Sequence, residues 1–463
     1  MGIERYQTKK NIKSVTHPFF GKGEVLGERW NGQELLVHFR IGITVWIPVS
    51  RLSIDRKREI RTPVVKRPPR IGDYGKRKIL EAFKLGIVPH RSVLDFTYGR
   101  EEEVEKINNA LLRAGKNGGG CMIVEGEYGA GKTHFLDYIY LCALNAGFAV
   151  SKASLDPFDV TPYKPRRVYR ELTSSFLYRN GKEKGFRDFV SEVIKSDILK
   201  DNRFFCPFED MNTVDEGLWD WIEGEPNPRW WLSKSKKTRR LPLLPSFSTS
   251  ADNYCYILSS LGWASRKLGK KGLVVLIDEA ETLFHLWWKT VAVEKGINLL
   301  RGLALTALNR LPDNIEGKIF KDEVIDATVE DLGEIRVIHR GIRSCMTPYI
   351  YRKPSGIFLV LAFTPTVASI YRDDILELLE RGVGFISLKR LPKSAYDEMF
   401  YRLVDIYRAS FLKISMTEKK TEELKRILLP FSERGIRTFL KATIDALDII
   451  RHYSDVDLQR LLD

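Results

Sequence analysis

Cysteine is scarce in this chain, and no two cysteines are spaced as in a metal site. The five cysteines lie far apart, without any C-x-x-C pair, at Cys121, Cys142, Cys206, Cys255 and Cys345. This pattern excludes a standard cysteine-rich zinc module and is typical of a reducing compartment, so we expect a cytoplasmic protein.

Long apolar runs are also missing. No run reaches the ~18 residues that a membrane-spanning helix needs, so we expect no transmembrane helix and no membrane partner. The N-terminal stretch MGIERYQTKK has no apolar segment behind its charges and does not predict a secretory signal. Low-complexity tracts are absent too. With 43% hydrophobic residues over 463 positions, the chain is expected to form two or three domains with cores of their own.

Positive charge is present in excess and is unevenly distributed. Residues 1–78 contain eighteen Lys and Arg against seven Asp and Glu, a net +11, so the remaining 385 residues carry only +4 of the total +15. This asymmetry favours a polyanionic partner near the N-terminus, nucleic acid in the simplest case, over a basic surface that is merely solvated.

The strongest motif lies at residues 121–136, CMIVEGEYGAGKTHFL. A short apolar run predicts a buried strand, the next eight residues fit G-x-x-x-x-G-K-[ST], and a helix is expected to follow. Glycines allow the backbone N–H groups to surround a phosphate, the lysine reaches the β- and γ-phosphates, and the threonine hydroxyl is a ligand for Mg²⁺. We therefore expect a nucleoside triphosphate and Mg²⁺ as cofactors, bound by Gly126, Glu127, Tyr128, Gly129, Ala130, Gly131, Lys132, Thr133 and His134.

A second decisive stretch, GLVVLIDEAE at 272–281, predicts a central parallel strand that ends in two acidic residues. Asp278 is expected to hold Mg²⁺, and Glu279 to activate the attacking water. Asp278 follows Lys132 by 146 residues. A minimal core needs fewer, which implies an insertion around 177–250.

A third strand is expected at 357–363, ending at Thr364. A polar residue at the tip of a strand beside the acidic strand can sense the γ-phosphate, and a simple strand-ending turn is the alternative for Thr364. A further strand is expected at 148–153, and helices are expected at 101–114 and 163–176.

The two ends of the chain predict separate modules. Residues 12–53 contain β-rich runs and resemble Tudor/SH3-like barrels, so we expect a small N-terminal β-barrel over 1–54 that binds protein or nucleic acid, or only caps the chain. A basic, proline-containing linker follows at 55–74, then a helix at 75–85. After the ATPase core at 75–390, residues 391–463 predict a helical lid, with helices at 395–410, 418–429 and 434–452.

The insertion contains Trp219, Trp221, Trp230 and Trp231 beside a basic run, Lys234, Lys236, Lys237, Arg239 and Arg240. Interleaved aromatic and basic residues can stack bases and follow a phosphate backbone. The same tryptophans can equally form the core of a helical insertion, and the sequence does not decide between the two.

Several stretches together resemble the BrxD-type ATP-binding proteins of BREX phage-defence systems: residues 86–101, the phosphate loop, Leu155-Asp156-Pro157, YCYILSSLGW at 254–263 and the acidic strand. The resemblance covers roughly residues 75–450. It implies an α/β fold with a P-loop AAA+ core and a parallel sheet, ATP as the nucleotide, and a helicase or another defence protein as partner. Similarity to origin-recognition-type ATPases implies that Val88 and Pro89 contact the base. Similarity to AAA+ proteins implies that Arg437 is a lid sensor, and that Arg381 reaches the γ-phosphate of a neighbouring copy in a homo-oligomer; compensation of a helix dipole is the alternative for Arg381.

Two functions remain open from the sequence. The leading hypothesis is an ATP-hydrolysing AAA+ protein that acts on nucleic acid, DNA in the first place, or loads or regulates a helicase in anti-phage defence. The alternative is an ATP-dependent docking switch for a protein partner, with little or no hydrolysis. Glu279 favours the first hypothesis, because a pure switch needs no carboxylate to activate water.

Overall fold

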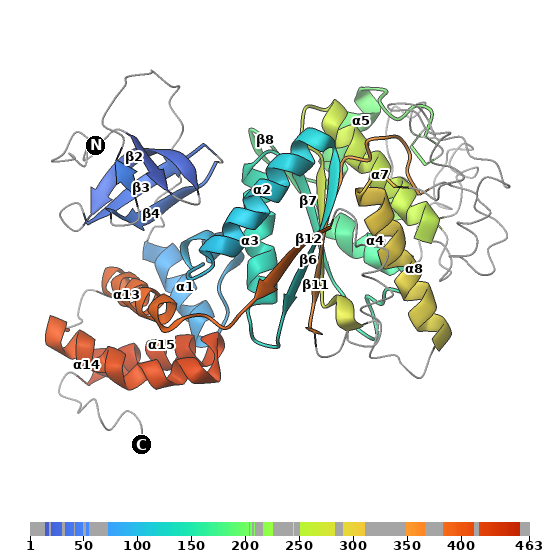
Figure 1. The fold of residues 1–463 in the computed structure, drawn as a ribbon. Coiled ribbons are helices and arrows are strands. Elements are labelled where there is room, and N and C mark those ends of the chain that lie inside the picture. The colour runs from blue at the N-terminus through green and yellow to red at the C-terminus, as the bar shows by residue number, and fades with distance from the viewer. Residues whose placement is uncertain are drawn as a thin grey trace. The chain divides into compact units, whose positions relative to one another are not determined.

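The computed structural model describes residues 14–17, 20–29, 33–40, 42–49, 52–54, 73–202, 204–205, 208, 216–225, 244, 251–282, 290–310, 349–365, 383–411 and 416–453 (Figure 1). The chain forms two compact units. Unit 1 comprises Met1–Lys106, Tyr128–Leu141 and Lys389–Asp463, and unit 2 comprises Ile107–Glu127 and Cys142–Leu388.

The N-terminal part of unit 1 is an antiparallel sheet with strand order β4-β3-β2-β1-β5. Leu35, Val37 and Phe39 alternate along β3 and are buried, as expected for a strand with one face in a core. This sheet fits the small barrel-like domain predicted for this region. Its strands are β1 (Ser14–His17), β2 (Gly21–Arg29), β3 (Glu34–Phe39), β4 (Thr44–Pro48) and β5 (Ser53–Ile54).

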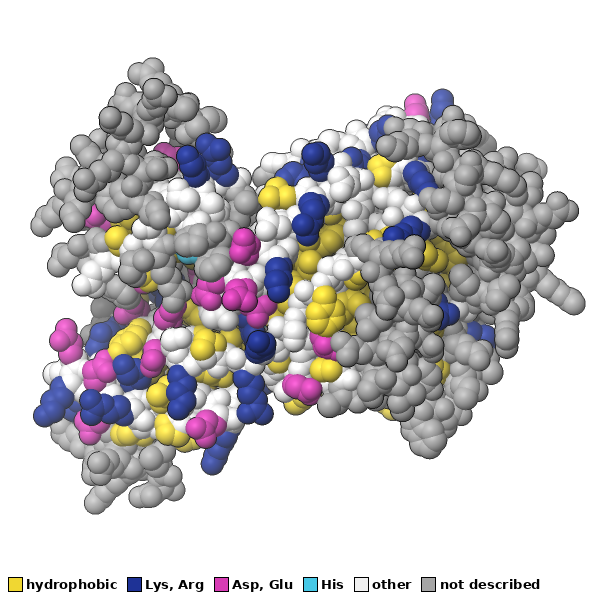
Figure 2. All heavy atoms as spheres, in the orientation of Figure 1, with side chains coloured by type: hydrophobic (Ala, Val, Ile, Leu, Met, Phe, Trp, Pro, Cys, Tyr) yellow, Lys and Arg dark blue, Asp and Glu magenta, His cyan; other side chains and the backbone are white. Residues whose placement is uncertain are grey.

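The C-terminal part of unit 1 is the predicted helical lid. Its three helices lie where the sequence predicts them, at α13 (Lys393–Ser410), α14 (Glu418–Leu428) and α15 (Ile436–His452), with the short 3-10 helix η8 (Leu429–Arg434) before α15. Helix α1 (Asp73–Lys84) packs against α13 and α15 through Ile79, Leu80 and Phe83, which share one core with the lid helices. Basic and acidic side chains are mixed on the visible face of the lid (Figure 2). Residues 55–72 of the predicted linker lie outside the described residues, and α1 begins at Asp73.

Unit 2 is built on a seven-stranded sheet with the order β12-β6-β11-β10-β7-β8-β9. The first five strands of this list are parallel, and β8 and β9 extend the sheet antiparallel. One strand, β11, separates the phosphate-loop strand β6 from the acidic strand β10. The sheet confirms the predicted α/β class with a parallel sheet that contains the phosphate-loop strand. The strands are β6 (Gly119–Gly126), β7 (Ala149–Ser154), β8 (Leu177–Asn180), β9 (Lys182–Gly185), β10 (Leu273–Asp278), β11 (Ile357–Phe363) and β12 (Val383–Leu388).

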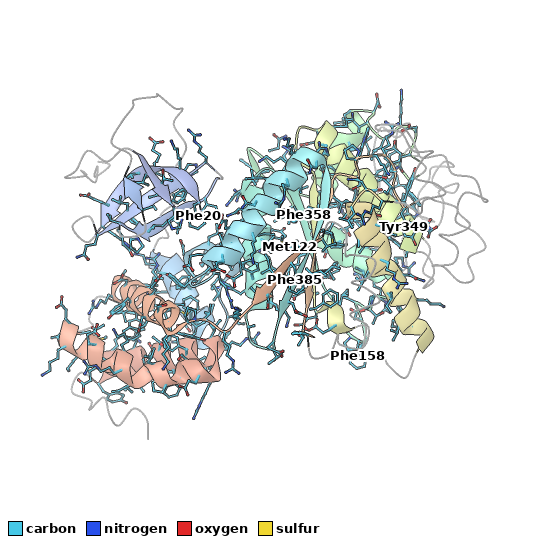
Figure 3. The ribbon with its side chains drawn as sticks, in the orientation of Figure 1. Phe20, Met122, Phe158, Tyr349, Phe358 and Phe385 are labelled. Atoms are coloured by element: carbon cyan, nitrogen blue, oxygen red, sulfur yellow. The ribbon has the colours of Figure 1, made fainter. Side chains whose placement is uncertain are left out.

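The two faces of the parallel sheet carry different sets of side chains. Odd-numbered residues such as Ile123, Val275 and Leu359 belong to the main core, which includes side chains of α4 (Pro165–Ser174), α7 (Ala251–Lys267) and α8 (Thr290–Ala307). Even-numbered residues, among them Met122 and Phe358, project from the opposite face, where Figure 3 labels both side chains. All six residues of β10 and all seven of β11 are buried, which explains their uninterrupted apolar sequences.

The inserted region is tied to the core by helices that the sequence did not place. Trp219 and Trp221 lie in α6 (Glu216–Ile222) and are buried in the main core, at 8% and 2% exposure. Arg187 of α5 (Phe186–Lys195) pairs with Glu216 and Glu223 and fixes α6 against α5. These two tryptophans therefore form core rather than a base-stacking surface. Trp230, Trp231 and the basic run at 234–240 lie outside the described residues.

No helix in the described part of the chain combines the length and the apolar character required to cross a membrane.

Candidate nucleotide site

The phosphate loop connects β6 to α3 (Lys132–Asn145) with the backbone geometry that its glycines allow. Gly129 and Gly131 have φ values of +81° and +92°, a region that residues with a Cβ rarely adopt. The loop ends where α3 begins, so that the N–H groups of the first helical turn are available to an anion. Lys132 is 6% exposed, whereas Tyr128 at the tip of the loop is 87% exposed.

The start of this loop shares one sheet edge with the other predicted catalytic residues of unit 2. Phe363 of β11 is level with Glu125 of β6, so Thr364 follows at the level of Gly126. On the next strand Ile277 is level with Leu361, and Asp278 closes β10. Because parallel strands end at the same edge, this edge carries the loop, Thr364 and Asp278.

Asp278 is a buried carboxylate with a cation beside it. It is 1% exposed, and its Oδ2 atom lies 3.8 Å from Nζ of Lys152 on the neighbouring strand β7. The Glu279 N–H donates to Asp278 Oδ1 at 3.1 Å, and Glu279 itself has φ +54°. This left-handed turn directs the two acidic side chains differently, as expected if one binds metal and the other activates water.

Thr364 is more than the end of a strand. Its hydroxyl donates a hydrogen bond to Oε1 of Glu281, and both side chains are buried, at 7% and 2% exposure. Glu281 follows Asp278 after the left-handed turn, so the bond links the tips of β10 and β11. The predicted sensor residue is thus in hydrogen-bond contact with the acidic segment.

In unit 1, the predicted base-binding segment meets the start of lid helix α15. Gly86 has φ +68°, and a Cβ placed on it would lie 3.1 Å from Cβ of Arg437. Ile436 is the residue before Arg437. Its Cδ1 atom lies 3.9 Å from where a Cβ on Gly131 of the phosphate loop would be. Arg437 is exposed at this junction. The base segment, the lid arginine and the phosphate loop therefore meet within one unit.

The residues between this segment and α2 (Glu101–Asn117) are also joined to the phosphate-loop helix. Thr97 Oγ1 lies 2.9 Å from Nε2 of His134 and donates its own proton to the Val93 carbonyl at 2.7 Å. Since that hydroxyl has only one proton, His134 Nε2 is the donor in their bond. His90 Nε2 lies 4.0 Å from Asp137 on the same helix. Val88 packs against the lid core, and Pro89 precedes the 3-10 helix η3 (His90–Asp95).

The structure thus brings together two sets of predicted residues. Unit 2 joins Asp278, Glu279 and Thr364 at one edge, and unit 1 joins Gly131 and Arg437. Sequence reasoning did not identify Lys152 or Glu281. Glu281 stood in the string DEAE and could have been noted, whereas Lys152 becomes visible only once β7 is known to pair with β10. Arg381 lies outside the described residues, so its role in a neighbouring copy stays a prediction.

The residues present fit a magnesium nucleotide. Two glycines at positive φ followed by a helix start form a cradle for phosphate, and Thr133 and Asp278 are oxygen donors of the kind that Mg²⁺ prefers. Lys132 adds a positive charge at the start of the helix. Within unit 1 the loop is thus suited to phosphates and Thr133 to a metal ion, and within unit 2 Asp278 is suited to a metal ion.

Residues 71–201 match the family described as "BREX system ATP-binding protein BrxC/D". This confirms the predicted resemblance over a region that contains the phosphate loop, and it supports ATP as the ligand. The Aeropyrum pernix ORC2 protein in its ADPNP–ADP complexes aligns with 79% of this chain and 67% of its own, at 14% identity and a TM-score of 0.35. Its ADP form aligns with 80% and 71%, at 12% identity and the same TM-score. No curated protein sequence matches the chain.

Proposed function

We propose that this protein hydrolyses ATP and uses the cycle in the cytoplasm to act on DNA, or to load or regulate a partner helicase, in anti-phage defence. The observation that carries the proposal is the shared sheet edge, where the phosphate loop begins beside Thr364 and Asp278. Nucleotide binding alone requires the phosphate loop. A buried acidic residue followed by a differently directed glutamate adds what hydrolysis requires.

In the proposed reaction, residues of this chain bind and orient the phosphates and activate the attacking water. Loop N–H groups and Lys132 hold the phosphates, and Glu279 accepts a proton from the water that attacks the γ-phosphorus atom. The bond from the γ-phosphorus to the bridging oxygen breaks, and ADP and inorganic phosphate are released. Thr133 and Asp278 are the candidate ligands for Mg²⁺, which would supply neutralisation of charge on the phosphate oxygens. Arg437 on the lid completes the site over the nucleotide. The match of residues 71–201 to a family described as an ATP-binding protein of BREX systems supports a role in phage defence.

The test compares ATP hydrolysis by the wild type and Glu279→Gln, each alone and with single-stranded or double-stranded DNA. We expect turnover that DNA stimulates and that Glu279→Gln lowers at least a hundredfold, because the amide cannot accept the proton, while ATP affinity is retained. The stimulating form of DNA would identify the track. Tight ATP binding without turnover under any of these conditions would contradict the proposal and support the docking switch instead.

A further inference from the structure

Arg100 is a buried cation attached to the phosphate loop. It lies directly before α2 and is 7% exposed. One guanidinium nitrogen, Nη2, donates to the backbone carbonyl of Ala130 at 2.7 Å. The other, Nη1, pairs with Oε1 of Glu103 at 3.2 Å. A buried guanidinium that uses one arm on a carboxylate and the other on a loop carbonyl is held in a single orientation.

The geometry of the peptide bond gives this contact a consequence. A trans peptide is planar, so the carbonyl of Ala130 and the N–H of Gly131 point in opposite directions. Fixing the carbonyl toward Arg100 therefore turns the Gly131 N–H away from Arg100. Without such a tie the peptide could rotate, because glycine tolerates both signs of φ, and here Gly131 has φ +92°.

We propose that Arg100 is a positioning residue of the phosphate loop. By holding the Ala130 carbonyl it keeps the Gly131 N–H directed at the β-phosphate of a bound nucleoside di- or triphosphate. The inference rests on the proposed function only in that the loop binds such a nucleotide. Burial lowers the pKa of the Arg100 guanidinium, and the Glu103 carboxylate beside it opposes that shift. The carboxylate thus favours the charged form, which donates both hydrogen bonds.

A purely structural role for Arg100, tying α2 to the loop, would have a different signature. Loss of such a role would lower the stability of the protein and weaken the binding of every nucleotide to a similar extent. A role in orienting the Gly131 N–H acts only on ligands with a β-phosphate. Arg266 provides a matched control, because its guanidinium also donates to a backbone carbonyl, that of Gly115 at 2.8 Å, but touches no residue of the phosphate loop.

The experiment measures dissociation constants for ATP, ADP and AMP, together with the melting temperature without nucleotide, for the wild type, Arg100→Gln, Arg100→Lys and Arg266→Gln. We expect Arg100→Gln to weaken ATP and ADP at least tenfold and AMP less than twofold. Arg100→Lys retains the charge but not the two guanidinium nitrogens that donate in different directions, so ADP binding should weaken severalfold. Arg266→Gln should leave all three affinities within twofold of the wild type.

Two results would overturn the inference while leaving the proposed function intact: wild-type ATP affinity in Arg100→Gln, or an equal loss for ATP, ADP and AMP. Absence of ATP binding by the wild type would instead refute the proposed function itself. If Arg100→Gln does not fold, Arg100→Lys and Glu103→Gln carry the same comparison. Glu103→Gln frees the second arm of the guanidinium and should weaken ADP more than AMP.

Discussion

The hydroxyl of Thr364 donates a hydrogen bond to the carboxylate of Glu281, and this bond joins the tips of strands β11 and β10 at the edge where the phosphate loop begins. Both side chains are buried. Thr364 is the residue predicted to sense the γ-phosphate. A change at this residue therefore alters the hydrogen bonding of the segment that carries Asp278 and Glu279.

Replacing Thr364 by Val should lower the rate of ATP hydrolysis about tenfold. Valine has nearly the same shape but leaves the buried Glu281 carboxylate without this donor, a loss of about 1–3 kcal/mol. Thr364→Ser retains the hydroxyl and is the control. Steady-state turnover and ATP affinity would be measured for both variants. Equal turnover in the two would show that the hydrogen bond has no part in the reaction.

Replacing Lys152 by Met should raise the affinity of the ATP-bound protein for Mg²⁺. The ammonium group lies 3.8 Å from the carboxylate of Asp278 and competes with a divalent cation for it. We expect the Mg²⁺ concentration for half-maximal hydrolysis to fall severalfold. Lys164→Met, a change in the same unit at a lysine whose ammonium group lies over the Tyr163 ring, is the matched control. An unchanged or higher Mg²⁺ requirement in Lys152→Met would refute this competition.

Replacing Gly86 by Ala should weaken ATP binding through the lid. The new Cβ would lie 3.1 Å from Cβ and 3.3 Å from the carbonyl oxygen of Arg437, so the first turn of α15 must shift. The positive φ adds about 1–2 kcal/mol of strain. Gly147→Ala is matched for strain, since Gly147 has φ +91° with no atom within 4 Å of its added Cβ. Both variants should melt earlier, but only Gly86→Ala should raise the dissociation constant for ATP, as calorimetric titration can show.

The stability of the lid should depend on pH through Asp448. Its carboxylate accepts a hydrogen bond from Tyr407 and pairs with Lys84 of α1 at 2.8 Å. Burial by itself would raise the pKa of Asp448, but the bonds from Lys84 and Tyr407 outweigh it and lower this pKa. A lowered pKa in the folded state stabilises the protein at pH values above the unfolded pKa of about 4, and this contribution is lost as the pH falls through the folded pKa.

Asp448→Asn should accordingly destabilise the protein at pH 7 by about 1 kcal/mol, a modest value because the pair is partly exposed. Thermal melts at pH 7 and at successively lower pH would show the difference from the wild type shrinking below about pH 4. Asp445→Asn, an exposed position on the same helix, should have little effect at any pH. A difference that persists unchanged at low pH would exclude the charge of Asp448 as its cause.

The sequence by itself determined the main strands and helices and the motif of the phosphate loop. The phosphate loop was readable because glycines at Gly126, Gly129 and Gly131 with Lys132 and Thr133 form a local pattern, and β10 and β11 because uninterrupted apolar runs indicate strands buried on both faces. The lid helices were readable from their apolar periodicity. Each of these signals lies within a few consecutive residues.

Only the tertiary structure decided which residues meet. Lys152 faces Asp278 because β7 pairs with β10, and Arg100 reaches Ala130 across 30 positions. Trp219 and Trp221 are core because α6 folds back onto the main core, although the same aromatic pattern also fits a base-stacking surface. Strand pairing and helix packing depend on complementary surfaces brought together from distant parts of the chain. A window of consecutive residues contains the side chains for such contacts but not the partner that selects among them.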